Sequence, residues 1–430
     1  MTYQETLTYL FNATPVFEHV GATAYKEGLE NTLLLDEHFG HPHRRFKTIH
    51  VAGTNGKGSC SHTIASILQA CGYRVGLYTS PHLVDFRERI KVNGHCISEK
   101  DVIDFVEQEK KFFEPLHPSF FELTTALAFK FFAEEKVDWA VVEVGLGGRL
   151  DCTNIVTPEL SVITNISFDH TGFLGNTLSA IANEKAGIIK EGKPVVIGEH
   201  TEETRPVFLK KAHEKHAPII FAQEEPEIME TKETGSGLVC RTRSFGQVVS
   251  PLTGDYQKKN LNTILTTASL LIGMGIIVER ENVGKGIAQV ISATGLQGRW
   301  QTLSEHPKTV CDTGHNVGGW EYLGKQIGRQ TYTTLRIVFG MVDDKDLDHV
   351  MEILPQDATY YFTKAHSKRA IPEEKVRQEG IKHKLHGNSY DCVKNAYLQA
   401  IKDADADDFI FVGGSSYVVA DLLEFLQHNH

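Results

Sequence analysis

Short apolar runs alternate with longer amphipathic segments from Phe46 onward. The run FKTIHVAG is followed by SCSHTIASILQACGY and then by RVGLYTS, and Ile64, Ile67, Leu68 and Cys71 in the middle segment recur at helical spacing. A strand, a glycine turn and an amphipathic helix in this order predict one βαβ unit of a parallel sheet. The N-terminal part of the chain is therefore expected to have an α/β fold.

This alternation continues to about residue 198 and then changes. Further buried strands are predicted at 139–145, 160–166 and 194–198, with helices at 120–135 and 177–190. Between about 219 and 255, short alternating pieces surround the acidic stretch EEPEIMETKETGSG. This pattern predicts a small antiparallel excursion with an exposed loop.

A second series of strands and helices follows the long predicted helix KKNLNTILTTASLLIGMG. The segment GLQGRW at 295–300 places two glycines before this series and is the predicted hinge. Strands are predicted at KTVCDTG, RIVFGMV, TYYFTKA and FIFVGG, with helices at GWEYLGKQI, DLDHVMEIL, SYDCVKNAYLQAIKDA and YVVADLLEFL. We expect two α/β domains: 1–296, with a central, mostly parallel sheet, and 297–430, which is smaller.

Composition narrows the class of protein. The chain has 430 residues, 44 basic and 55 acidic, and its net charge of −11 argues against a nucleic-acid or anionic-membrane partner. The seven cysteines contain no CxxC pair and are typical of reduced cytosolic thiols. The first residues lack a signal-peptide pattern, and no apolar run approaches the ~20 residues that span a bilayer. We expect a soluble cytoplasmic protein.

The stretch HVAGTNGKGSCSHT at 50–63 has the features of a phosphate-binding loop. Backbone N–H groups of a glycine turn between strand and helix converge on an anion, and the helix N-terminus adds partial positive charge. Lys57 would reach the outer phosphates and the Ser59 hydroxyl would bind Mg²⁺. Gly58 intervenes where the usual P-loop has its hydroxyl residue next to lysine. A glycine turn without a ligand is the less favoured alternative, and kinase, switch and ligase remain open.

Polar residues follow two further predicted strands. Glu143 ends an apolar run, which favours a magnesium ligand, although a structural ion pair with Arg149 is an alternative. Asp169 and His170 follow the run SVITNI, where a functional histidine and a structural one are equally acceptable. The helical pattern around Lys185 by itself indicates a lysine on a helix surface.

Three residues near the predicted hinge form a second group. Arg299 stands where the two domains would face each other, and Asp312 and His315 end the next strand. An arginine at a domain gap can neutralise charge that develops on a transferred phosphoryl group. Together these residues suggest that the second domain closes on the nucleotide.

Several motifs occur together and in order along nearly the whole chain. They are YKEGLENTLLL, IHVAGTNGKGS, TSPHLVDFRERIKVNG, FFELTTALAF, EVGLGGRLDCTN, DHTGFLGNTLSAIANEKAGIIK, QKKNLN, QGRW, DTGHN, FGMVDDKD and GGSSY. In this the sequence resembles the folylpolyglutamate synthase and dihydrofolate synthase family of the Mur ligase superfamily, whose pattern includes the glycine at position 58. The resemblance implies an ATP-dependent ligase that joins L-glutamate to dihydropteroate, to the γ-carboxylate of a folate, or to both. It also implies a P-loop ATPase-like domain at 1–296 that binds ATP and folate, and a Rossmann-like domain at 297–430 that binds glutamate. The acceptor carboxylate would first become an acyl phosphate, releasing ADP, and the amine of glutamate would then displace phosphate.

The same resemblance implies roles for individual residues, with ATP, two Mg²⁺ ions and a carbamylated Lys185 as cofactors. Lys57, Lys185, His170 and Arg299 would be catalytic. ATP would be bound by Asn55, Gly56, Lys57, Gly58, Ser59, Asn260, Arg299 and Asp312, and the metal ions by Ser59, Ser80, Glu143 and His170. The pterin and folate would contact Ser80, Pro81 and His82 in a mobile loop that runs to about Arg89, with Phe121, Glu122, Thr124, Leu150, Asp151 and Cys152. Glutamate would contact His315 and Ser415.

Three departures from the family pattern stand out. Gly314 replaces the usual alanine, Gly413 the usual threonine, and Asp255 with Tyr256 stand in a segment that usually reads GxHQ. The first two are changes between small residues, whereas the third puts the role of residues 254–260 in question.

Alternatives to a folate-directed ligase are another Mur-type amino-acid ligase and a nucleotide-dependent switch. If the chain is a folate-directed ligase, we expect it to add the first glutamate to dihydropteroate and also to extend tetrahydrofolates, rather than to synthesise polyglutamates alone. The absence of a coiled-coil pattern is compatible with a monomer.

Overall fold

The computed structural model describes residues 1–13, 28–234, 237–343 and 345–428. The chain forms two compact units. The first unit comprises Met1–Ser167, Thr171–Pro251 and Gln257–Leu296, and the second comprises Phe168–His170, Leu252–Tyr256 and Gln297–His430. Motif residues 25–27 and 344, and residues 235–236 of the predicted acidic loop, lie outside the described residues.

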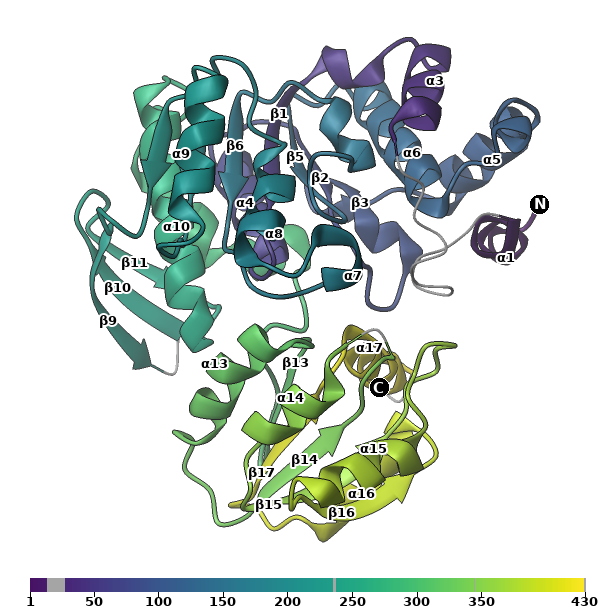
Figure 1. The fold of residues 1–430 in the computed structure, drawn as a ribbon, viewed down its shortest axis with the longest axis vertical. Coiled ribbons are helices and arrows are strands. Elements are labelled where there is room, and N and C mark those ends of the chain that lie inside the picture. Colours follow the sequence, from purple (N-terminus) through teal and green to yellow (C-terminus); the bar gives the residue numbers. More distant parts are fainter. Residues whose placement is uncertain (14–27, 235–236, 344, 429–430) are drawn as a thin grey trace. The chain divides into compact units, whose positions relative to one another are not determined.

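An eight-stranded sheet forms the centre of the first unit (Figure 1), in the order β4-β3-β2-β5-β1-β6-β7-β8. Its strands are β1 (Lys47–Ala52), β2 (Val75–Tyr78), β3 (Ile90–Val92), β4 (His95–Cys96), β5 (Trp139–Glu143), β6 (Leu160–Ile163), β7 (Val195–Ile197) and β8 (Ile219–Phe221). Six strands run parallel, while β3 and β4 pair antiparallel at one edge. The central strands are buried on both faces, which is why they read as continuous apolar runs. The predicted α/β class is confirmed.

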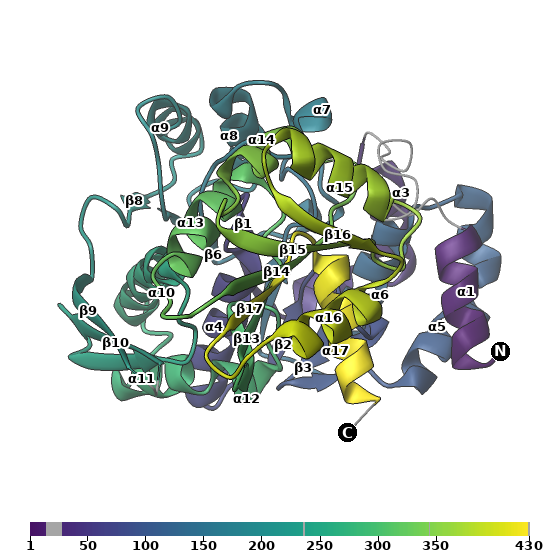
Figure 2. The same ribbon diagram turned by 90° about the horizontal axis from the view of Figure 1, so that it is seen from below.

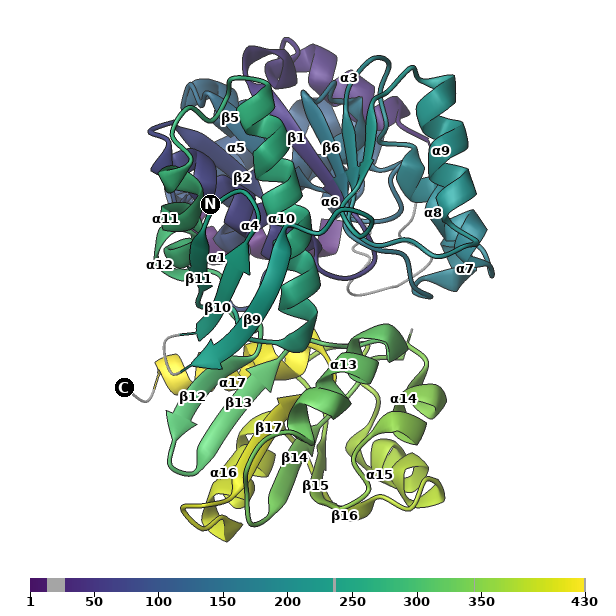
Figure 3. The same ribbon diagram turned by 90° about the vertical axis from the view of Figure 1, so that its left-hand side faces the viewer.

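Helices cover both faces of this sheet. They are α1 (Tyr3–Ala13), α3 (Glu30–His38), α4 (Lys57–Ala70), α5 (Glu99–Phe113), α6 (Phe120–Glu134), α7 (Thr171–Leu174), α8 (Leu178–Ala186), α9 (Arg205–Glu214), α10 (Asp255–Gly273), α11 (Glu281–Ala288) and α12 (Val290–Thr294). One core packs α4, α10 and α11 against the sheet, and another packs α8 and α9 against its opposite face (Figure 3). The predicted helix at 177–190 extends four residues too far at its C-terminal end, because α8 ends at Ala186.

A second, antiparallel sheet of the first unit lies beside α10 (Figure 3). It consists of β9 (Ile228–Thr234), β10 (Gly237–Thr242) and β11 (Gln247–Ser250). The predicted antiparallel excursion is confirmed, but the prediction of a loop over its acidic stretch is wrong for 228–234. That segment pairs with β10 as an edge strand, and its charged side chains are exposed because one face and one edge meet water.

The second unit is a six-stranded sheet in the order β12-β13-β17-β14-β15-β16. Its strands are β12 (Gln301–Glu305), β13 (Lys308–Asp312), β14 (Leu335–Phe339), β15 (Ala358–Thr363), β16 (His386–Tyr390) and β17 (Phe409–Gly413). Its helices are α13 (Val317–Ile327), α14 (Leu347–Ile353), α15 (Glu373–Lys382), α16 (Val393–Asp403) and α17 (Ser416–Gln427). Figure 2 shows α13, α14 and α15 on one side of the sheet and α16 and α17 on the other.

The second unit also corrects one prediction. The helix expected at 389–404 begins only at Val393, since 386–390 form the parallel edge strand β16. Among the described residues, no helix is both long enough and apolar enough to cross a membrane.

Candidate active site

The phosphate-loop motif lies where the sequence predicts it, between β1 and α4. Gly53 and Gly56 have φ values of 146° and 84°, which favour glycine. A Cβ on Gly53 would lie 1.8 Å from Thr164 Oγ1, and one on Gly56 would lie 2.2 Å from Asn260 Oδ1. Gly56 caps α4 without a side-chain hydrogen bond, so the N–H groups of the first turn are directed at the loop. An anion is the ligand that such a turn favours.

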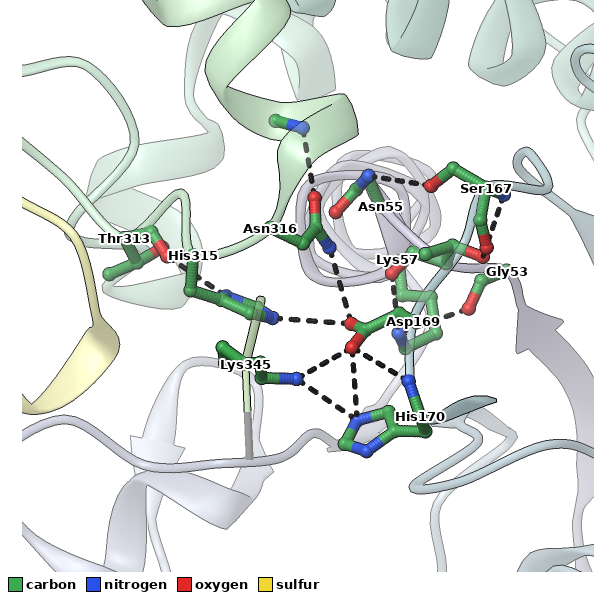
Figure 4. Close-up of polar contacts among 12 residues, drawn as sticks. Gly53, Asn55, Lys57, Ser167, Asp169, His170, Thr313, His315, Asn316 and Lys345 are labelled. Carbon is green, nitrogen blue, oxygen red and sulfur yellow. Dashed lines mark hydrogen bonds and ion pairs between the residues drawn. The ribbon is translucent and has the colours of Figure 1, made fainter. Parts of the chain in front are cut away.

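Residues 164–167, which follow β6, brace this loop. The backbone N–H of Asn55 donates to Asn165 Oδ1 (2.8 Å), and the Thr164 hydroxyl donates to the carbonyl of Asn55 (2.6 Å). The Asn55 side chain donates to Ser167 Oγ (3.2 Å; Figure 4). Lys57 Nζ folds back onto the carbonyls of Gly53 (3.1 Å) and Thr54 (3.0 Å). The loop is therefore held in one shape by side chains of a neighbouring strand end.

The first turns of α10 contact the same loop. Ser59 is fully buried, and its Oγ accepts a hydrogen bond from Gln257 Nε2 (3.1 Å). Gln257 Oε1 in turn accepts from Asn260 Nδ2 (3.0 Å). Asn260, a predicted ATP contact, thus lies against Gly56 and is linked to Ser59 through one glutamine. Gln257 and Asn260 therefore contact the phosphate loop, although Asp255 and Tyr256 before them depart from the family pattern.

Two of the predicted metal ligands, Glu143 and Ser80, lie at the carboxyl ends of neighbouring parallel strands of the first unit. Glu143 is the last residue of β5, pairs with Val51 of β1 and is 4% exposed. Ser80 follows the end of β2, which pairs with β5. Arg149, the alternative partner for Glu143, forms an ion pair with Glu184 (3.0 Å). Oxygen groups near one strand edge are the donor set that Mg²⁺ prefers.

Lys185 is buried, with 4% exposure, and its Nζ donates to the carbonyl of Gly53 (2.9 Å). The surface position that the helical pattern indicates is therefore wrong. The cause is a close approach at two glycines: a Cβ on Gly148, in the loop after β5, would lie 2.7 Å from the Glu184 carbonyl, and one on Gly187, at the end of α8, would lie 2.4 Å from Arg149 Cα. These glycines let the loop approach α8 closely and cover the lysine.

The predicted pterin residues of α6 are partly structural. Glu122 forms a capping box with Ser119 at the start of α6 and is 3% exposed. The Thr124 hydroxyl contacts the phenol of Tyr78 (3.0 Å). The half-buried ring of Phe121 covers Gly145, where a Cβ would lie 2.4 Å from it. Of this group, Phe121 is the residue with surface left for a ligand.

Asp151 organises the loop after β5. Its carboxylate accepts from the backbone N–H groups of Leu146 (2.8 Å) and Thr153 (3.0 Å) and from the Thr153 hydroxyl. Burial raises its pKa, although these donors oppose the shift. Burial and the charge of Asp151 also raise the pKa of the Cys152 thiol, and Leu150 beside them is half-buried.

The loop after β2, which carries Ser80, Pro81 and His82, is internally hydrogen bonded. Glu88 accepts from the backbone N–H groups of residues 83, 84 and 85 at 2.8–2.9 Å. Arg89 is 1% exposed and donates to His82 Nδ1 (2.8 Å). The loop thus presents a defined conformation.

In the second unit, Arg299 and Asp312 lie close together. The Arg299 guanidinium donates to the carbonyl of Gly298 (3.2 Å) and to the Thr313 hydroxyl. Asp312, at the end of β13, is 3% exposed and accepts from the backbone N–H of Trp300 (2.7 Å). Burial raises the pKa of Asp312, whereas its hydrogen bonds and Arg299 favour the ionised form.

A carboxylate surrounded by cationic and polar groups forms a second cluster of this unit (Figure 4). Asp169 contacts Lys345 Nζ (2.7 Å), Asn316 Nδ2 (3.2 Å) and His315 Nε2 (3.4 Å). His170, beside it, has a φ of 49° and lies 3.5 Å from Lys345 Nζ. Burial alone would raise the pKa of Asp169, but Lys345 and the two imidazoles hold it well below its usual range.

Ser415 is the remaining predicted glutamate contact. It caps α17, with its Oγ accepting from the Val418 N–H (3.2 Å), and it is 2% exposed. Sequence reasoning missed Lys345 and Gln257. Lys345 lies in the motif FGMVDDKD and Gln257 in the motif QKKNLN, so each motif marked its residue. Their partners, Asp169 and Ser59, are distant in sequence, and the sequence alone could not pair them.

The structure brings the phosphate loop, Glu143 and Lys185 together at one edge of the first unit's sheet. It gathers Asp169, His170 and His315 within the second unit, and Arg299 with Asp312 at the end of β13. The metal-ligand set predicted from sequence is thus divided: Ser59, Ser80 and Glu143 belong to the first unit and His170 to the second.

Family models and known proteins resemble this chain over nearly its whole length. Residues 51–268 match the Mur ligase middle domain, and residues 298–416 match the Mur ligase glutamate ligase domain. The dihydrofolate synthase/folylpolyglutamate synthase of Bacillus subtilis is 33% identical over 422 residues, covering 94% of this chain and 95% of the relative. The folylpolyglutamate synthase of Lacticaseibacillus casei is 30% identical over 440 residues and covers 99% of both.

Solved structures agree with these matches. Escherichia coli FolC in complex with DHPP and ADP has a TM-score of 0.85 at 31% identity, covering 100% of this chain and 98% of that one. Mycobacterium tuberculosis folylpolyglutamate synthase complexed with ADP and AMPPCP has a TM-score of 0.87 at 28% identity, covering 99% and 98%. The phosphate loop, the motifs around it and these full-length matches agree, and the chain belongs to the folylpolyglutamate synthase family of the Mur ligases.

Proposed function

We propose that this chain joins L-glutamate both to dihydropteroate and to the γ-carboxylate of tetrahydrofolate. Membership of the family makes it an ATP-dependent ligase that adds glutamate to folates. A carboxylate is a poor electrophile at neutral pH, so the acceptor carboxylate attacks the γ-phosphorus of ATP and ADP leaves. The amine of glutamate then attacks the acyl carbon, an amide bond forms and phosphate leaves with the acyl C–O bond broken.

The observation that carries the proposal is the contact between Lys185 and the phosphate loop. Lys185 Nζ lies 2.9 Å from the Gly53 carbonyl, in the unit where Lys57 and Ser59 begin α4 and Glu143 ends β5. A nucleotide switch needs the phosphate loop but has no need of a second buried lysine beside it. A ligase that stabilises a transferring phosphoryl group uses both.

Mg²⁺ fits the donors of the first unit. Ser59, Ser80 and Glu143 offer two hydroxyls and a buried carboxylate, which suit a hard cation, and His170 would add a nitrogen ligand. Two bound Mg²⁺ ions would neutralise charge on the phosphate oxygens. The chain's own residues would hold the triphosphate: the first-turn N–H groups of α4 and Lys57 at its outer end.

Carbamylation of Lys185 is part of the proposal. CO₂ adds to a neutral amine and gives a carbamate anion, and removal from water favours the neutral form of a lysine. The position of Lys185 suits this chemistry because its side chain is buried, with 4% exposure. The carbamate would add negative charge close to the metal ligands.

The remaining roles divide between the units. The first would hold the folate, with Phe121, Asp151, Cys152 and the loop from Ser80 to Arg89 as its contacts. The second would hold glutamate through His315 and Ser415 and contact the nucleotide through Arg299 and Asp312. Closure of the second unit on the nucleotide, a monomeric state and a cytoplasmic location stay predictions.

Product analysis with two acceptors tests the proposal. The purified protein is incubated with ATP, Mg²⁺ and L-glutamate plus either 7,8-dihydropteroate or tetrahydrofolate, and products are identified by mass. Addition of one glutamate to dihydropteroate and of at least one to tetrahydrofolate is expected. Addition to tetrahydrofolate alone would make the chain a polyglutamate synthase only, and addition to neither would indicate another Mur-type ligase.

A further inference from the structure

The buried carboxylate of Asp312 is held by three donors. Its Oδ2 accepts from the backbone N–H of Trp300 (2.7 Å) and from the phenol of Tyr256, and its Oδ1 accepts from the backbone N–H of Gly314 (2.8 Å). A carboxylate has about four lone-pair sites. Two of these contacts fill Oδ2, so the site that remains for a ligand is on Oδ1.

Tyr256 comes from a segment far from Asp312 in sequence, and that segment is fastened to the second unit. The Tyr256 ring packs against the core of this unit. The backbone N–H of Asp255 donates to Gln326 Oε1 (3.1 Å), and the Asp255 carboxylate pairs with Arg329. A Cβ on Gly254 would lie 2.8 Å from the Tyr256 ring, so glycine makes room for it.

The phenol is the one side-chain donor among these three contacts. The two backbone donors reach one oxygen each: Trp300 directly precedes β12, and Gly314 follows the end of β13. The phenol adds a second donor on Oδ2, so that both lone-pair sites of this oxygen are occupied. Because a buried carboxylate that loses a donor bears a desolvation cost, Asp312 depends on this contact more than an exposed residue would.

We propose that Tyr256 is a positioning residue for the nucleotide: its hydroxyl fixes the Asp312 carboxylate so that Oδ1 accepts a hydrogen bond from bound ATP or ADP. The inference rests on the proposed function, which assigns Asp312 to the nucleotide. Tyr256 acts through Asp312 and has no contact with the reacting atoms in this scheme.

The test compares Tyr256→Phe with a matched variant, Tyr361→Phe. Tyr361 lies in β15 of the same unit and donates to Asp403 Oδ2 (3.0 Å), so its variant also loses one tyrosine–aspartate hydrogen bond. The dissociation constant of Mg–ADP is measured by calorimetry for the full chain. Tyr256→Phe is expected to raise it about tenfold, the effect of one hydrogen bond to a charged group, and Tyr361→Phe is expected to leave it unchanged.

Kinetics provide a second readout. Tyr256→Phe is expected to raise the KM for ATP and leave the KM for glutamate unchanged, since a general loss of structure would affect both. An unchanged ADP affinity in Tyr256→Phe, together with a weakened affinity in Asp312→Asn, would overturn the role of Tyr256. Unchanged affinity in Asp312→Asn as well would overturn the assignment of Asp312 to the nucleotide, which belongs to the proposed function.

Discussion

Lys185 and Gly53, 132 positions apart, are joined by a hydrogen bond of 2.9 Å between the lysine Nζ and the glycine carbonyl. The bond ties α8 to the first residue of the phosphate loop. The chemical role proposed for Lys185 requires a buried lysine at this point, and its side chain is 4% exposed.

Replacement of Lys185 by alanine is expected to lower phosphate release about a hundredfold or more, because it removes the proposed carbamate beside the transferring phosphoryl group. The variant should still fold and bind ATP. Added short-chain carboxylates such as acetate should restore part of the activity, since they can occupy the space of the carbamate. Activity is measured by phosphate release with and without acetate.

Lys190→Ala is the control for that experiment. Lys190 is a neighbouring lysine whose Nζ donates to the Asn154 carbonyl (2.8 Å), and its loss should give no carboxylate-dependent recovery. Wild-type activity in Lys185→Ala without any addition would contradict the carbamate role.

Lys57→Ala should also reduce phosphate release by about a hundredfold or more with every acceptor, because it removes a positive charge from the outer phosphates. Lys130→Ala, which breaks a surface pair with Glu134, should be indistinguishable from wild type. Turnover near the wild-type rate in Lys57→Ala would rule out the phosphate-loop assignment.

Glu143→Gln tests the proposed metal site. Glutamine keeps the size of the side chain but removes the charge, so the Mg²⁺ concentration for half-maximal activity should rise more than about tenfold. Glu184→Gln is the matched control. Glu184 lies in α8 and pairs with Arg149, an exposed residue of the loop that follows Glu143. The idea fails if the two variants have the same Mg²⁺ dependence.

His50 should make stability depend on pH. It is fully buried in β1, donates to the Thr153 hydroxyl (2.8 Å), and burial, with the nearby charge of Lys190, lowers its pKa to about 3. An unfolded histidine has a pKa of about 6.5. Below about pH 6.5 the unfolded chain binds a proton at His50 that the native chain does not bind. The free energy of unfolding therefore falls by up to about 1.4 kcal/mol per pH unit until about pH 3.

His50→Gln should remove this dependence. Between pH 7 and pH 5 the free energy of unfolding should fall by about 2 kcal/mol less than in the wild type, as measured by urea denaturation. His216→Gln, at an exposed histidine, should follow the wild-type curve. Parallel curves for wild type and His50→Gln would show that folding does not lower the pKa of His50.

The local patterns were sufficient for much of the fold and not for the partners within the site. The periodicity of β1 and α4 and the glycines between them predict the phosphate loop, because that motif is continuous in sequence. Lys185 was misplaced because its burial depends on Gly148, which no helical pattern contains. The strand β16, HGNSY, has no apolar run and exists because it pairs with β15 at the edge of the sheet.

The acyl phosphate is the central claim, and isotope transfer tests it most directly. Tetrahydrofolate carrying ¹⁸O in its γ-carboxylate is incubated with the protein, ATP, Mg²⁺ and L-glutamate, and the released phosphate is analysed by mass. If the carboxylate attacks ATP, one carboxylate oxygen leaves with the phosphate, and each phosphate formed from labelled acceptor should carry one ¹⁸O. Product formation with unlabelled phosphate would contradict the account.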